Sequence, residues 1–92
     1  MFLQGGLDSG QKEKLIQRLK SVPKDMTFDE AESLLRYFSY ARSNKGKTSG
    51  SRVMYTSDSH PPILLHKPHP RKELLEYQVK QLIDILKQEG LI

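Results

Sequence analysis

The fold is decided by two nearby stretches, Gly46-Lys47-Thr48-Ser49-Gly50-Ser51-Arg52-Val53-Met54-Tyr55 and Ile63-Leu64-Leu65-His66-Lys67-Pro68-His69-Pro70. The first has the composition of a basic loop that leads into a strand rich in β-branched and aromatic residues. The second predicts a short apolar strand that ends at a corner of histidine and proline, because proline cannot donate to a strand ladder. Two short strands need a backing layer to be stable, and helical patterns stand on both sides of them.

Three segments have the apolar spacing of amphipathic helices. The first starts at a cap formed by Asp8 or Ser9, ends before Pro23 and has an apolar stripe of Leu15, Ile16, Leu19 and Val22. The second follows the capping box Thr27-Phe28-Asp29-Glu30, fades near Arg36 and is expected to bury Phe28, Ala31, Leu34 and Leu35. The third ends at Gly90, with Leu91 folding back, and has a stripe of Leu75, Val79, Leu82, Ile83 and Leu86.

Three segments are predicted to be strands. In residues 37–43 the aromatic side chains of Phe38 and Tyr40 alternate with small residues, which is the period of a strand. The other two strands are residues 51–56 and 63–66, separated by an irregular stretch that contains Pro61 and Pro62. The sequence therefore predicts an α+β domain of two layers in the order α-α-β-β-β-α, with helices on one face of a three-stranded antiparallel sheet. Residues 1–8 are expected to be a disordered tail, and residues 9–92 a single domain.

Length and composition exclude several classes of protein. A chain of 92 residues makes one small domain, in which a deep enclosed cleft is not expected. Cysteine is absent, so disulfide and thiolate chemistry are excluded, and a cytoplasmic location is expected. No apolar run approaches the roughly 18 residues that a membrane span requires.

Positive charge is concentrated in the middle of the chain. Residues 36–72 hold eight lysines and arginines against Asp58 alone, a net charge of +7, whereas the whole chain carries +4. The three histidines, His60, His66 and His69, lie in the same window. Such a distribution is typical of a surface that binds phosphate, although a solvated basic loop has the same composition.

Several of these features together resemble the HicA toxins, over about residues 12–92. The resemblance rests on Gly50-Ser51 before the second strand, on Pro68-His69 and Lys72-Glu73-Leu74, and on a last helix that closes with Glu89-Gly90-Leu91. HicA proteins are small bacterial ribonucleases with a fold like that of double-stranded-RNA-binding domains, and each is paired with a HicB antitoxin. The resemblance implies an RNA-binding toxin of a type II toxin-antitoxin pair, a metal-independent mRNA endoribonuclease that a HicB-like protein neutralises.

One position departs from the family pattern. Where the family has a histidine that is taken to be catalytic, this chain has Arg52. Arginine can hold a phosphate through two hydrogen bonds, but with a pKa above about 12 it cannot act as a general base near neutral pH. Fold and partner are therefore expected to carry over, whereas it is left open whether the chain is an enzyme. The alternative is a non-catalytic RNA-binding or partner-binding module of the same fold, and a helical docking domain without an RNA role is a third hypothesis.

Metal-free RNA cleavage requires a base, an acid and positive charge beside the phosphorus. Histidine suits both proton-transfer roles. His69, which matches the corner histidine of the family, is the first candidate and His66 the second, with Arg52 as the phosphate clamp. Each histidine has an alternative interpretation as an ordinary surface side chain. No cofactor is expected, and the pair His66 and His69 is too small a ligand set to predict a metal site.

A second set of residues is expected to bind RNA without taking part in the reaction. The candidates are Arg42, Lys45, Lys47, Ser51, Arg52 and Lys67. Tyr40 and Tyr55 either stack on bases or belong to the core, and the core is favoured for Tyr55. The expected partners are RNA and a HicB-like antitoxin, with no membrane, and a homodimer is left open.

Overall fold

The computed structural model describes residues 3–43 and 52–92 of the chain, with side chains from residue 10 onward. Over these residues the chain has an α+β fold with three helices and a three-stranded antiparallel sheet, as predicted. Along the chain the elements are α1 (Leu3–Lys20), α2 (Phe28–Tyr37), β1 (Ala41–Arg42), β2 (Arg52–Thr56), β3 (Ile63–His66) and α3 (Glu76–Gln88).

The sheet is a meander in the order β1-β2-β3, and its two faces differ sharply in burial. On the inner face Tyr55 pairs with Ile63, and both side chains are buried. On the outer face Met54 pairs with Leu64, which is 48% exposed. Because successive side chains of a strand point to opposite faces, this register leaves the outer face open to solvent.

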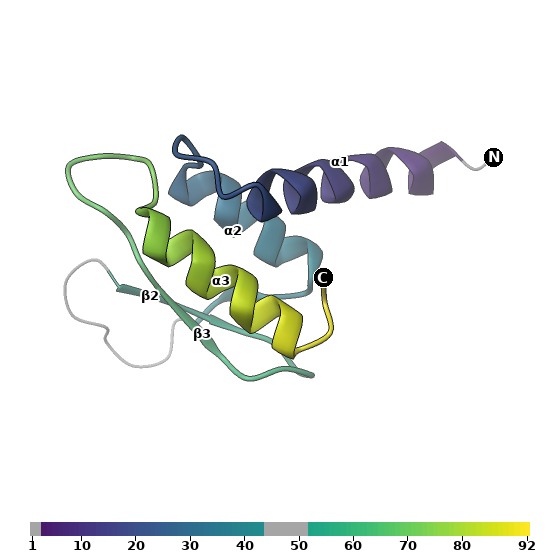
Figure 1. Cartoon of the computed structure of the whole chain (residues 1–92). Coiled ribbons are helices and arrows are strands. Elements are labelled where there is room, and N and C mark those ends of the chain that lie inside the picture. The colour runs from purple at the N-terminus through teal and green to yellow at the C-terminus, as the bar shows by residue number, and fades with distance from the viewer. Residues whose placement is uncertain (1–2, 44–51) are drawn as a thin grey trace.

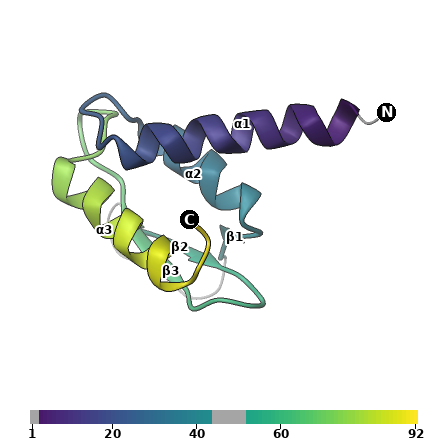
Figure 2. The same cartoon turned by 45° about the vertical axis from the view of Figure 1, so that its right-hand side comes forward.

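Figures 1 and 2 show how the helices are arranged on the inner face of the sheet. Both views place α2 and α3 between the sheet and α1, so α1 lies on the outer side of the two helices. Ile16 and Leu19 of α1 join the common core. The other core side chains are Met26, Phe28, Ala31, Leu34, Leu35, Phe38, Tyr40, Tyr55, Ile63, Leu65, Leu74, Val79, Leu82, Ile83 and Leu86.

Helix α2 begins where the capping box predicts. The amide of Glu30 donates to the Thr27 hydroxyl at 3.1 Å, and the amide of Thr27 donates to the Glu30 carboxylate at 2.9 Å. Two amides that the helix itself leaves without acceptors are satisfied in this way. The four side chains expected to be buried in this helix are indeed buried. The end of α3 also agrees, since Gly90 has a φ of +72° and the amide of Leu91 donates to the carbonyl of Leu86 at 2.9 Å.

The structure corrects the expected boundaries of two elements. Helix α1 begins at Leu3, whereas the sequence predicts a disordered tail over residues 1–8 and a cap at Asp8 or Ser9. It ends at Lys20, before the expected Val22. The first strand is only Ala41–Arg42, and Tyr37 belongs to α2.

The aromatic alternation over residues 37–43 does not arise from a strand. Ser39 has a φ of 68° in the turn that follows α2, and this turn brings both Phe38 and Tyr40 into the core. The Tyr40 hydroxyl donates to the carbonyl of Pro61 at 2.8 Å, so the ring is fixed by a segment far along the chain. Leu75 is a further correction, because it precedes α3 and is 36% exposed instead of joining the apolar stripe.

Candidate functional site

The outer face of the sheet carries the first group of candidate residues. Arg52, at the start of β2, lies directly opposite His66, at the end of β3, and both residues are exposed. Side chains that are directly opposite in an antiparallel pair have Cβ atoms about 5 Å apart. The register therefore places the side chains of Arg52 and His66 on the same exposed face, with neighbouring Cβ atoms, beside the apolar pair Met54 and Leu64.

Helix α3 fixes the end of β3 through a buried glutamine. The side-chain amide of Gln78 donates to the carbonyl of His66 at 2.7 Å, and its oxygen accepts from the amide of Leu75 at 2.9 Å. Gln78 is only 4% exposed. The position of the His66 backbone is thus set from the helical side, while its side chain points outward.

The second group of candidate residues lines a pocket beside the start of α2. The pocket has a volume of about 260 Å³ and lies between residues 27–29 and residues 67–72. Two backbone hydrogen bonds hold these segments together: the amide of Phe28 donates to the carbonyl of Lys72 at 3.0 Å, and that of Leu74 donates to the carbonyl of Met26 at 2.8 Å. We call it the corner pocket, because it follows the corner of histidine and proline after β3.

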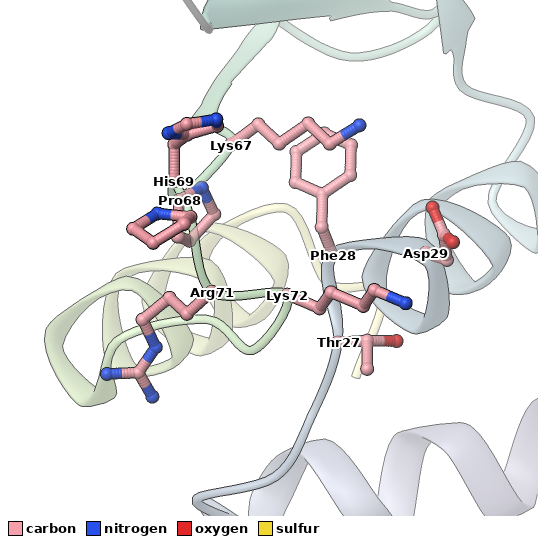
Figure 3. A pocket seen from close by; sticks show the side chains of 9 residues that line it. Thr27, Phe28, Asp29, Lys67, Pro68, His69, Arg71 and Lys72 are labelled. Carbon is pink, nitrogen blue, oxygen red and sulfur yellow. The ribbon is translucent and has the colours of Figure 1, made fainter.

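Figure 3 shows how the basic side chains of the corner pocket are arranged. Lys67 and Lys72 extend to the same side, toward the start of α2, while Arg71 extends to the opposite side. The Lys67 amine lies 5.7 Å from the centre of the Phe28 ring, at a cation–π distance. Arg71 donates to the carbonyl of Glu73 at 3.0 Å. His69 is exposed at the rim, and its peptide bond to Pro70 is cis.

The two candidate histidines therefore lie in different surroundings. His66 lies opposite Arg52 on the sheet, whereas His69 lines the corner pocket with Lys67. The first candidate from the sequence, His69, thus belongs to the pocket, and it is the second candidate that the register places beside the arginine. His60 is elsewhere again, with Nδ1 3.0 Å from the Glu89 carboxylate and its ring stacked on Tyr40.

Arg42 does not lie on the outer face with Arg52. Its register partner is Tyr55, and its guanidinium donates to the carboxylate of Glu32 on α2. The Tyr55 hydroxyl donates to the same carboxylate at 2.8 Å. Arg42 thus lies on the opposite face of the sheet from Arg52, where its half-exposed side chain is paired with Glu32, and its part in RNA binding stays a prediction.

The contacts among Arg42, Glu32 and Tyr55 shift the pKa values of the glutamate and the tyrosine. The hydrogen bond from Arg42 lowers the pKa of Glu32, and burial opposes it only in part. Burial and the bond to Glu32 raise the pKa of Tyr55. The carboxylate is consequently held ionised and the phenol neutral, which is the arrangement of a structural ion pair.

Both tyrosines proposed for base stacking belong to the core. Tyr55 is fully buried, which confirms the favoured interpretation, and Tyr40 is 2% exposed, so neither ring can stack on a base from the surface. Lys45, Lys47 and Ser51 lie outside the described residues, and their place in an RNA-binding surface stays a prediction.

Sequence reasoning missed Glu32, Gln78, Phe28 and Lys72 as residues that build these sites. For Glu32 a signal was present, because it lies four residues after Phe28 on the buried side of α2. For Gln78 the signal was its place three residues after Leu75 on the same side of α3 as Leu82. Lys72 could not be found in this way, since its place depends on the pairing of two distant segments.

The chain matches no family model, no curated protein and no solved structure. Within residues 3–43 and 52–92 no three His, Asp or Glu residues gather closely enough to hold a metal ion. None of the described helices is both long and apolar enough to cross a membrane.

Proposed function

We propose that the chain is a HicA-like toxin that binds messenger RNA on the outer face of the sheet and cleaves it without a metal ion. The observation that carries this proposal is the pairing of Arg52 with His66 on the exposed face of the sheet, and in the sequence Arg52 follows a segment that contains Lys45 and Lys47. The order α2, β1, β2, β3, α3 supports the finer proposal of a fold like that of double-stranded-RNA-binding domains. In this account an acidic HicB-like antitoxin covers the same face.

The two side chains have complementary roles in the proposed reaction. Arg52 holds the scissile phosphate and balances the charge that develops on the phosphorane. A neutral imidazole of His66 takes the proton of the 2′-hydroxyl, whose oxygen attacks the phosphorus. The bond between phosphorus and the 5′-oxygen of the next nucleotide then breaks, and a general acid protonates this oxygen. The products are a 2′,3′-cyclic phosphate and a 5′-hydroxyl. His69, three residues further on, is the other histidine to be tested for a proton-transfer role.

The test compares single variants on one RNA substrate in the presence of EDTA. His66→Ala is expected to lower the cleavage rate by about 10²–10⁴-fold with little change in RNA affinity, because only proton transfer is lost. Arg52→Ala is expected to lower both quantities. Lys20→Ala, an exposed cation in the last turn of α1, is the control and should change neither. Equal cleavage by the parent chain and by both His66→Ala and His69→Ala would exclude these histidines from the reaction.

Arg52 itself favours a second candidate function, a non-catalytic RNA-binding module. Since arginine cannot act as a base, a chain with Arg52 at this position can retain phosphate affinity without the chemistry. This hypothesis predicts RNA binding that weakens with salt and no cleavage at any pH from 5 to 9. Gain of cleavage in Arg52→His would then identify the missing group.

A further inference from the structure

The corner pocket has a composition that the proposed sheet surface does not explain. Three cationic side chains, Lys67, Arg71 and Lys72, line it against one carboxylate, Asp29, and His69 stands at its rim. A volume of about 260 Å³ is too small for a folded ligand or an extended strand, but it accommodates a group the size of a phosphorylated sugar. The pocket therefore favours a small anion over a large apolar ligand.

The lysines of the corner pocket are not engaged by carboxylates. In the described part of the chain, no carboxylate oxygen lies within 4 Å of the amine of Lys67 or Lys72. Arg71 differs, because it bonds the Glu73 carbonyl and points to the other side in Figure 3. The two lysines thus extend together over the Phe28 side of the pocket, which also holds Asp29, and neither forms a direct ion pair there.

Two amides at the start of α2 already have acceptors within the chain. The amide of Phe28 already donates to the Lys72 carbonyl, and that of Glu30 donates to Thr27. The first of these bonds also ties the backbone of Lys72 to the helix, which makes this side of the pocket rigid. Lys67 is steadied from the other side by the Phe28 ring. Lys72 is thus held through its backbone and Lys67 through the contact of its amine with the Phe28 ring, which reduces the entropy lost when an anion binds.

We propose that the corner pocket is a phosphate-binding subsite, in which the amines of Lys67 and Lys72 hold the oxygens of one phosphate group. The inference deepens the proposed function, since the phosphate would belong to an RNA that continues onto the sheet face from His66. The same oxygens are presented by a 5′-terminal phosphate and by a phosphodiester within the strand. The subsite would bind a nucleotide away from Arg52 and so set where the RNA lies on the sheet.

The first experiment uses inorganic phosphate as the probe. In a ¹⁵N–¹H NMR titration at constant ionic strength, phosphate is expected to shift the amide signals of residues 27–29, 67, 69, 71 and 72, and chloride is not. Lys67→Met and Lys72→Met should each weaken phosphate binding by about tenfold, the value of one charge-assisted hydrogen bond. Lys87→Met, which removes an exposed cation in the last turn of α3, is the matched control and should leave phosphate binding unchanged. Equal affinities in all four proteins would overturn the proposal.

The second experiment separates the subsite from the proposed function. Two RNA oligonucleotides of one sequence, with and without a 5′-phosphate, are compared by fluorescence anisotropy. Preference for the phosphorylated oligonucleotide that disappears in Lys72→Met indicates a terminal phosphate, and equal losses for both indicate an internal one. RNA binding that Lys67→Met and Lys72→Met leave unchanged contradicts the subsite but not the RNA-binding function. Phosphate binding without any RNA binding contradicts the function but not the subsite.

Discussion

At the scale of single residues, Glu32 determines which cations remain available for function. Its carboxylate lies in the core and accepts hydrogen bonds from Arg42 and Tyr55. Arg42 therefore serves stability, although its position in the basic window predicts phosphate binding. The sequence thus gives the total charge of a segment but not the partner of each cation, because a buried carboxylate can form an ion pair with a half-exposed arginine.

Replacing Glu32 by glutamine is expected to destabilise the fold. Glu32→Gln weakens both hydrogen bonds and leaves Arg42 without its counter-charge, at a cost of about 2 kcal/mol in the free energy of unfolding. Tyr55→Phe removes one of the two bonds and should cost about 1 kcal/mol. Urea denaturation followed by circular dichroism measures both changes. Glu76→Gln, on the exposed side of α3, is the control, and an equally large loss there would contradict the role assigned to Glu32.

The same carboxylate predicts how stability depends on pH. The pKa of Glu32 in the folded chain lies below its ordinary value of 4.5, chiefly because Arg42 donates to it. Folding therefore favours the ionised form, and the stabilisation is complete above the unfolded pKa and is lost as pH falls through the folded one. Between pH 7 and pH 3 the free energy of unfolding is expected to fall less in Glu32→Gln than in the parent chain. Identical pH dependence in the two proteins would contradict this assignment.

At the scale of elements, Gln78 joins the sheet to the helical layer at the end of the strand that carries His66. It bonds the His66 carbonyl and the Leu75 amide from a buried position. Gln78→Met keeps the length of the side chain but leaves both backbone groups unsatisfied, so a loss of about 2 kcal/mol is expected. Gln81→Met, on the exposed side of the same helix, is the matched control and should change stability little. Thermal unfolding monitored by circular dichroism compares the two variants.

Elements with a local signal could be predicted, and those with a distant partner could not. The capping box at Thr27 and the apolar spacing of α3 determine these helices within a few residues, so they follow from the sequence. The first strand does not, because Tyr40 is placed by its bond to Pro61, 21 residues away. The pairing of Arg52 with His66 likewise depends on the register of β2 and β3, which the irregular segment 57–62 does not specify.

At the scale of the whole molecule, the candidate residues lie on the parts of the surface that the helices do not cover. α2 and α3 cover the inner face of the sheet, so the outer face and the corner pocket carry the exposed candidates. The pocket itself could not be predicted, since it forms where residues 26–28 pair with residues 72–74. The fold thus brings the basic segment that follows β3 beside the start of α2, from separate parts of the chain.

The outer sheet face is tested most directly by the affinity for single-stranded RNA as salt is varied, measured by fluorescence anisotropy for the parent chain, Arg52→Ala and Lys20→Ala. If Arg52 contacts a phosphate, Arg52→Ala should weaken binding by about tenfold and reduce the slope of log affinity against log salt by about 0.7. Lys20→Ala should match the parent chain. RNA affinity and slope that are the same in Arg52→Ala as in the parent chain would contradict the account.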